Sequence, residues 1–411
     1  MSFAACHIPT VYEAADRVGV KVYSLDVGGT VVELGAVIVF PSWSTIRGLI
    51  EEHNIETALV DVHASRLGEH GEPVASSRPR GVIEWAKMLR GVARYRSLAL
   101  RASAEPDDGM SKLGAEHWEL FGRVVEREGF QPIREAIRRF FVGCGYGDDI
   151  DTVPVGYVMR LFDWPVLYSF LEMAAGREPP IVRFPNGYQQ LWQRVAERLD
   201  VKLSTPVKGI HKTADGFDVT TVDGTSRSFD RIVTAIAPQL LGKLEGDVVK
   251  PYAALAGNLE SVRYVATAWR GRAIPRGENP RFVTYFMGNH NGAPAGSIVM
   301  SLRPRPEIDV NVAYQFAADL SAEQLATRLR EDIVSRGGTL DAIVHQEIWP
   351  SYFPRYYPEK GNHGDHYQKV AALQTDQVLF AGGAVAFESV EHSASHARRL
   401  IREHYSPVRY L

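Results

Sequence analysis

Residues 377–387 read Gln-Val-Leu-Phe-Ala-Gly-Gly-Ala-Val-Ala-Phe, and residues 388–402 continue as Glu-Ser-Val-Glu-His-Ser-Ala-Ser-His-Ala-Arg-Arg-Leu-Ile-Arg. The first stretch is typical of a buried strand that ends in a glycine turn, and the second of an amphipathic helix. The first turn of a helix leaves backbone N–H groups unpaired and carries a partial positive charge. This junction therefore predicts a β–α unit that presents its helix start to a ligand above the strand.

A second pattern lies near the other end of the chain. Thr10-Val-Tyr-Glu13, followed by Asp16-Arg-Val-Gly19, is typical of the second strand of a dinucleotide-binding unit. An acidic residue at the end of that strand is placed to bind ribose hydroxyls, which makes Glu13 a candidate. The two ends together predict an α/β fold that binds a dinucleotide.

Size and composition exclude several classes of protein. The chain has 411 residues, 45% hydrophobic and 23% charged, so it should form more than one globular domain or lobe. A net charge of −3 gives no broad attraction to nucleic acid or to an anionic membrane. Two cysteines, Cys6 and Cys144, are too few for a disulfide framework and favour a cytoplasmic location. No apolar run approaches the ~20 residues that cross a bilayer, and we expect no signal peptide.

The order of predicted elements divides the chain. Residues 1–60 and 181–240 alternate strands and helices, as does the C-terminal part. Residues 104–176 are mostly helical, and residues 250–350 combine strands with one helix. We therefore expect one α/β nucleotide-binding domain that is interrupted twice.

This interrupted order resembles the flavin-dependent amine oxidase superfamily, and the chain looks most like the bacterial FAD-containing polyenoic fatty acid isomerases. The residues that carry the resemblance lie at 13–43, 145–158, 186–238 and 352–387. The resemblance implies an FAD/NAD(P)-binding, Rossmann-like domain of the GR2 type, interrupted by a helical lobe and a mixed substrate-binding sheet. The implied parts are an FAD-binding domain of residues 1–60, 181–240 and 351–411, a largely helical substrate lobe of residues 61–180, and a substrate-binding sheet of residues 241–350.

The resemblance also implies a set of FAD contacts, each assigned by its position in the matching blocks. Glu13 would bind the adenosine ribose, and the backbone of Val207 would pair with adenine. The phosphates and the ribityl chain would contact Arg17, Gly19 and Lys21, and the flavin would contact Gly35 and Ala36. The ribityl chain and the pyrimidine ring would lie along Gly382, Gly383, Val390 and Glu391.

Three departures from the family pattern keep a second hypothesis open. The sequence contains no Gly-x-Gly-x-x-Gly loop and starts at what resembles the middle of the first helix. Val20 stands where the family has a glycine, and Gly383 stands where the family has an acid. The alternative to a flavoenzyme is a flavin-free descendant of the fold that acts as a small-molecule binding protein or a non-redox catalyst.

The implied chemistry is hydride transfer between flavin N5 and a hydrophobic unsaturated small molecule, such as a polyenoic fatty acid. This chemistry needs no side-chain acid or base, so the sequence assigns no catalytic residue. Candidates for the substrate pocket are the aromatic residues Tyr157, Trp164, Tyr168 and Phe353. An amine oxidase is a third hypothesis. We predict no metal site, because His363, Asp365 and His366 lie in a turn sequence.

Overall fold

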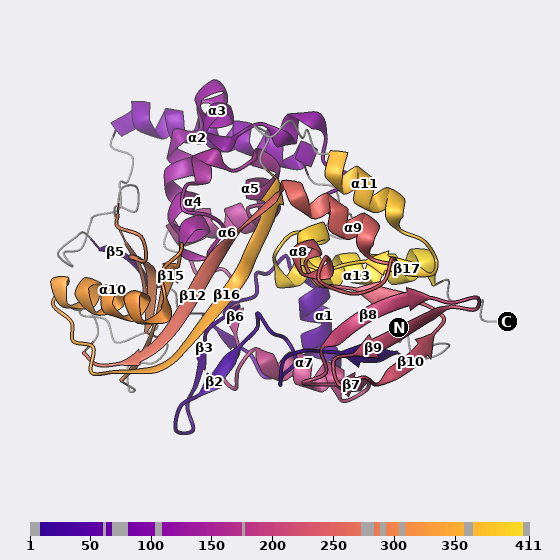
Figure 1. Cartoon of the computed structure of the whole chain (residues 1–411). Helices are drawn as coiled ribbons and strands as arrows, with labels where there is room; N and C mark the ends of the chain where they lie inside the picture. The colour runs from indigo at the N-terminus through magenta and orange to yellow at the C-terminus, as the bar shows by residue number, and fades with distance from the viewer. Residues whose placement is uncertain are drawn as a thin grey trace.

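The computed structural model describes residues 9–60, 63–67, 81–102, 109–174, 177–272, 283–287, 293–303, 309–356 and 365–405 (Figure 1). Its helices and strands form an α/β part, a helical part and a mixed sheet, so the predicted α/β fold is confirmed. No helix within these ranges is long and apolar enough to cross a membrane.

Two pairs of parallel strands form the α/β part. Strand β1 (Thr10–Tyr12) pairs with β7 (Asp200–Lys202), and β11 (Ile232–Thr234) pairs with β17 (Val378–Phe380). Each pair joins segments that are far apart in the sequence.

The predicted strand–turn–helix junction is present at the C-terminal end. Gly382 follows β17 with a φ of +88°, and a Cβ on it would lie 2.7 Å from the carbonyl oxygen of Ala235, so this position requires glycine. A short helix, α12 (Gly383–Ala386), comes next. The long helix α13 (Val390–His404) begins after Ser389, whose side chain accepts a hydrogen bond from the backbone N–H of His392.

A six-stranded mixed sheet forms one wall of the molecule. Its strand order is β16, β12, β15, β14, β13, β5, and only β5 runs parallel to its neighbour. The strands are β16 (Ala342–Tyr356), β12 (Leu259–Arg270), β15 (Val310–Phe316), β14 (Ile298–Arg303), β13 (Val283–Met287) and β5 (His63–Leu67).

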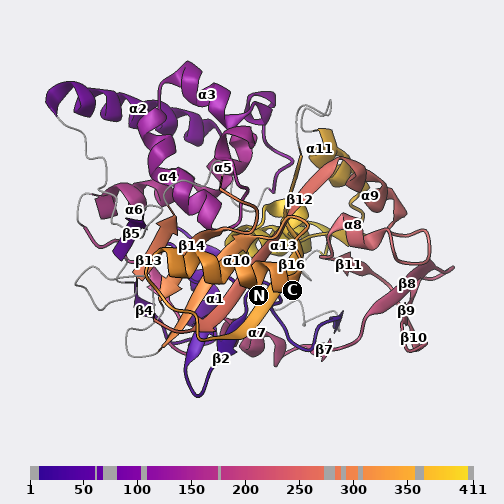
Figure 2. The same cartoon turned by 60° about the vertical axis from the view of Figure 1, so that its left-hand side comes forward.

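The two faces of this sheet differ. Helix α10 (Ala322–Ser335) covers one face, where Leu329 and Ile333 pack against Trp269 (Figure 2). The other face carries Tyr264 and Tyr314 and is turned toward the α/β part. This second face lines the cavity described below.

A helical part lies above the sheet in Figure 1. It shares one large apolar core with the α/β part, because side chains such as Phe141 and Tyr157 pack with Trp43 and Tyr188. Its helices are α2 (Gly81–Ala102), α3 (Phe121–Glu128), α4 (Gln131–Gly143), α5 (Val155–Leu161) and α6 (Trp164–Ala174).

The remaining elements connect these parts. A hairpin turns at Gly28 and Gly29, and a three-stranded meander precedes β11. These elements are β2 (Ser24–Asp26), β3 (Val31–Glu33), α1 (Ser44–Glu52), β4 (Ala58–Leu59), β6 (Val182–Arg183), α7 (Gln189–Ala196), β8 (Val207–Lys212), β9 (Phe217–Thr221), β10 (Ser226–Phe229), α8 (Pro238–Leu241), α9 (Lys250–Ala254) and α11 (Asp365–Leu373).

Candidate functional site

One cavity of about 1670 Å³ lies where the α/β part, the sheet and the helical part meet. Both ends of the chain that carried the nucleotide-binding pattern line it, through Lys21 and Gly35 on one side and Gly382 and Gly383 on the other. Pockets for a single small ligand usually measure about 300–1000 Å³, so this cavity has room for a cofactor and a substrate together.

Backbone packed directly on backbone forms the wall contributed by the opening segment. A Cβ on Gly35 would lie 2.0 Å from the carbonyl oxygen of Lys21, and the Ala36 N–H donates to that same oxygen at 3.2 Å. Gly19 has a φ of +84°, and a Cβ there would lie 3.2 Å from the Trp192 ring. The packing of the chain on itself therefore requires glycine at position 35, and the positive φ favours glycine at position 19.

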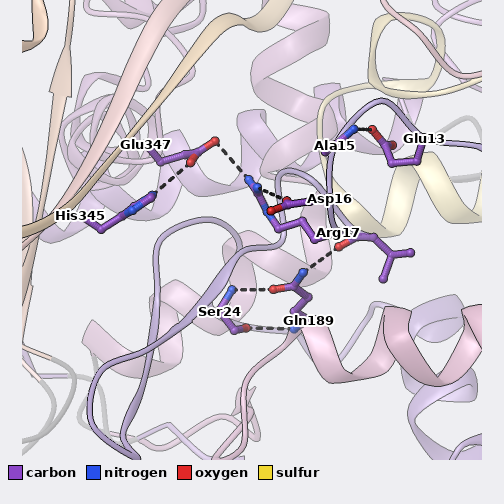
Figure 3. Close-up of polar contacts among 9 residues, drawn as sticks. Glu13, Ala15, Asp16, Arg17, Ser24, Gln189, His345 and Glu347 are labelled. Atoms are coloured by element: carbon purple, nitrogen blue, oxygen red, sulfur yellow. Dashed lines mark hydrogen bonds and ion pairs between the residues drawn. The ribbon is translucent and has the colours of Figure 1, made fainter. Parts of the chain in front are cut away.

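Glu13 also lines the cavity, at the end of β1. Its Oε1 accepts a hydrogen bond from the Ala15 N–H at 2.8 Å (Figure 3). The backbone on either side is fixed to the strand-end region of β7, since the Glu13 N–H donates to the carbonyl oxygen of Lys202. The carboxylate is thus held at the cavity edge by the turn that follows it.

Arg17 does not line the cavity. Its guanidinium pairs with Glu347 of β16 at 3.1 Å and lies 3.9 Å from the centre of the Tyr23 ring. The other oxygen of Glu347 lies 3.2 Å from Nε2 of His345 (Figure 3). Arg17 thus ties the opening segment to the sheet, and its role toward phosphate stays a prediction.

Lys21 and Glu388 form an ion pair inside the cavity. Lys21 Nζ also donates to the carbonyl oxygen of Ser351 at 3.2 Å. A Cβ placed on Gly383 would lie 3.0 Å from the other carboxylate oxygen of Glu388. Because Gly383 has no side chain, the Glu388 carboxylate can lie beside it. A carboxylate is therefore present here although position 383 does not carry the family's acid. The sequence prediction missed Glu388, although it is the first acidic residue after the glycine turn.

The start of α13 forms the next part of the wall, through Ser389 and Val390. Burial lowers the pKa of His392 to about 3, with a smaller contribution from Arg160, so its imidazole is neutral. Its Nδ1 lies 2.6 Å from Oγ of Ser389. The neutral ring fixes the helix start without adding charge to the cavity.

Glu391 and Val207 lie outside the cavity lining. The buried Glu391 carboxylate accepts hydrogen bonds from the backbone N–H groups of Thr45 at 3.0 Å and Ile46 at 2.9 Å. Glu391 therefore caps the N-terminus of α1, a helix remote from it in sequence. Val207 begins β8 and pairs with Thr221. The FAD contacts implied for both residues stay predictions.

The four aromatic pocket candidates do not line this cavity. Tyr157 is buried, its hydroxyl 2.7 Å from that of Tyr367, and it accepts a hydrogen bond from the Tyr356 N–H. Phe353 is buried against Tyr146 and Phe387. Trp164 and Tyr168 lie on α6, where Tyr168 is 44% exposed. Aromatic side chains pack equally well in a core and in a pocket wall, and here the core or the surface holds them.

Other aromatic residues line the cavity instead. They come mainly from the inner face of the sheet and from α4, α6 and the segment before α1. Burial raises the pKa values of the cavity tyrosines well above the ordinary value, so they are neutral hydroxyl groups. These lining residues are Phe40, Trp43, Trp85, Phe140, Tyr146, Phe170, Trp192, Tyr264, Tyr314, Trp349 and Tyr352.

Glu33 lies immediately before the cavity residues Leu34 and Gly35. Burial raises the pKa of Glu33 to about 7, although Ser24 and the Tyr188 N–H donate hydrogen bonds to its carboxylate. The folded protein therefore keeps this proton at a pH where the unfolded chain has lost it. Its contribution to stability falls as pH rises from about 4.5 to about 7.

The substitution Glu33→Gln is expected to remove this pH dependence. Between pH 5 and pH 7, the unfolding free energy of the unchanged protein should fall by about 2 kcal/mol relative to that of the variant. Urea unfolding of both proteins across this range measures the difference. Parallel pH profiles for the two proteins would contradict the prediction.

In the part of the chain that the structure describes, no group of three His, Cys, Asp or Glu side chains is arranged to hold a metal ion. His366 is buried with its ring centre 3.8 Å from that of Tyr356. Burial lowers the pKa of His366 to about 3. His363 lies outside the described residues.

A strand–glycine turn–helix junction that faces a glycine-lined cavity defines a nucleotide-binding protein of the Rossmann-like α/β class. The sequence model of the flavin containing amine oxidoreductase family matches residues 4–399, so the chain belongs to this family. Among curated proteins, no sequence match was found.

Solved structures support this assignment of the fold. The CLA-producing fatty acid isomerase from P. acnes is similar, with a TM-score of 0.83 at 18% identity over 96% of this chain and 92% of that chain. Putrescine oxidase bound to putrescine has a TM-score of 0.67 at 18% identity, over 96% and 92%. Cyclohexylamine oxidase from Brevibacterium oxydans IH-35A has a TM-score of 0.64 at 14% identity, over 97% and 94%. At these identities the similarity shows the fold alone.

Proposed function

We propose that this chain is an FAD-dependent oxidoreductase or double-bond isomerase acting on a hydrophobic, unsaturated small molecule of the polyenoic fatty acid type. One observation carries the proposal: a single, mainly apolar cavity extends from the glycine turn at Gly382 to the helical part at Phe170 and Leu171. Such a cavity can hold a long apolar molecule next to a nucleotide cofactor.

The residues present fit FAD, the cofactor implied by membership of this family. Gly19, Gly35 and Ala36 offer a wall with little side chain, and Gly382 and Gly383 offer a second one. Glu13 and Glu388 supply carboxylates that can accept hydrogen bonds from sugar and ribityl hydroxyls.

The chemistry required of the chain itself is modest. FAD, held between Gly35 and Gly382, would supply reversible hydride exchange with the substrate, so isomerisation would consume no external oxidant. The aromatic wall excludes water from the reacting carbons. Arg139 of α4 is a cationic group in the cavity lining and could bind a substrate carboxylate.

We also propose the division of the chain into an FAD-binding domain, a helical substrate lobe and a substrate-binding sheet.

Two measurements test this function. The purified chain, incubated with FAD and passed through a desalting column, should retain flavin absorbance. Incubation with a polyenoic fatty acid without oxygen should then give an isomer of unchanged mass. A chain that takes up no FAD but still binds the fatty acid would support the flavin-free alternative instead.

An amine substrate is a second candidate, and one observation favours it. Lys21 Nζ lies 5.2 Å from the centre of the Tyr352 ring, so the aromatic wall already accommodates a cation. Amine oxidation would consume oxygen and release peroxide, whereas isomerisation would not. Measuring oxygen uptake with a diamine and with a fatty acid separates the two reactions.

The substitution Glu388→Gln is expected to weaken FAD binding by roughly 10-fold, because a charged acceptor beside Gly383 is lost. Fluorescence titration with FAD measures the change. The matched control is Glu403→Gln, at a 49% exposed side chain near the C-terminal end of α13, which should leave the affinity unchanged. Equal affinities for the Glu388→Gln variant and the unchanged protein would show that Glu388 does not contact the cofactor.

A further inference from the structure

The N-terminal half of α2 projects from the helical part, at the upper left edge of the molecule in both views (Figures 1 and 2). Large apolar side chains are exposed on it: Val82 is 85% exposed, Ile83 73%, Trp85 52% and Leu89 63%. Single exposed apolar residues are common, but a contiguous group of this size marks an interaction surface.

Three of these residues share one face of the helix. Val82, Trp85 and Leu89 follow one another at intervals of three and four residues, which places them on one side. Trp85 and Leu89 also line the cavity, together with Met88 and Val92 of the same helix. The exposed apolar face is therefore continuous with the outer end of the cavity.

The charges of α2 oppose the net charge of the chain. The helix carries five basic residues and one acidic residue, whereas the whole chain has a net charge of −3. Lys87 and Arg90 are exposed on the projecting half, away from the face that carries Trp85. An apolar face with a Trp and a basic opposite flank is typical of a helix that lies in the plane of a membrane surface.

We propose that this face of α2 docks on an anionic phospholipid surface. Val82, Trp85 and Leu89 would enter the boundary between headgroups and acyl chains, and Lys87 and Arg90 would contact the anionic headgroups. The helix lies on the surface rather than across it, because its charged residues are spread over its whole length.

Docking in this orientation places the outer end of the cavity against lipid. An apolar molecule dissolved in the bilayer then enters the cavity along the face that carries Trp85 and Leu89, without crossing water. Only the identity of the molecule that enters the cavity depends on the proposed function. Docking itself is scored without flavin or turnover, so the two proposals fail independently.

The test is co-sedimentation of the full chain with phospholipid vesicles. Vesicles of phosphatidylcholine mixed with phosphatidylglycerol should bind the chain, and vesicles of phosphatidylcholine alone should bind it much more weakly. Trp85→Ser combined with Leu89→Ser should lower the partition coefficient by roughly 100-fold, because two large apolar side chains no longer enter the bilayer. Lys87→Gln combined with Arg90→Gln should remove the preference for anionic vesicles.

The matched control combines Leu59→Ser and Val222→Ser, at positions 66% and 63% exposed and outside α2. It should bind vesicles like the unchanged chain. All four positions of the two double serine variants are exposed, and circular dichroism verifies that each variant folds. Equal sedimentation of the Trp85→Ser/Leu89→Ser variant and the control would overturn the proposal. A second result would also overturn it. If analytical ultracentrifugation showed that the unchanged chain and the control are dimers and the Trp85→Ser/Leu89→Ser variant is a monomer, the partner of this face would be a second copy of the chain.

Discussion

Replacing Gly35 with alanine is expected to lower the unfolding free energy by at least about 3 kcal/mol, at the upper end of the range for overpacking. The added Cβ would lie 2.0 Å from the carbonyl oxygen and 2.8 Å from the carbonyl carbon of Lys21, and 3.1 Å from the Tyr23 nitrogen. These are backbone atoms, so no side-chain rotation relieves the overlap. The backbone at Lys21 must move, and it forms part of the cavity wall. Loss of FAD binding should therefore accompany the loss of stability.

Gly48→Ala is the matched control for this substitution. Gly48 lies inside α1, and a Cβ there meets nothing within 4 Å. Alanine is the better helix former, so this variant should gain about 0.5–1 kcal/mol. Urea unfolding and FAD titration of both variants give the comparison. Wild-type stability of the Gly35→Ala variant would mean that the segments around Lys21 and Gly35 are not packed as described.

Removing the carboxylate of Glu391 has the second large expected effect. Glu391 is only 2% exposed and accepts from two N–H groups at the start of α1. Glu391→Ala leaves both donors buried without a partner, which should cost about 2–4 kcal/mol. Because α1 packs against α13, the loss should also loosen the junction that carries Val390.

Two further variants make the test specific. Glu391→Gln keeps one acceptor oxygen and should lose about half as much stability as Glu391→Ala. Glu51→Gln, at an exposed position of α1, should change stability by no more than about 0.5 kcal/mol. Urea unfolding measures all three variants. A Glu391→Ala variant as stable as Glu51→Gln would show that α1 does not depend on this cap.

The parts of the fold that the sequence predicts are those with a local signal. The strand and glycine turn up to Gly382 and the helix after it depend on neighbouring residues, and so does the strand that precedes Glu13. The placement of Lys21 and Gly35 across the cavity from Gly383 came from the family resemblance, which carries long-range information that local patterns lack.

The features that the sequence does not predict depend on partners far away in the chain. Glu391 caps a helix that begins at Ser44, and Glu388 pairs with Lys21, and neither pairing leaves a local pattern. Tyr157 has the composition of a pocket residue, but only its neighbours decide that it is core. The projecting face of α2 is an exception, because the spacing of Val82, Trp85 and Leu89 is a local pattern and yet was not predicted.

Strand β16 has a consequence for how this chain can vary in length. This one 15-residue strand contacts the opening segment twice, through Glu347 to Arg17 and through Ser351 to Lys21. It then reaches the helical part, where the Tyr356 N–H donates to Tyr157. Deleting one residue within it would turn every later side chain to the opposite face of the sheet. Insertions and deletions among homologous chains should therefore fall outside residues 347–356, and substrate preference should diverge by substitution there.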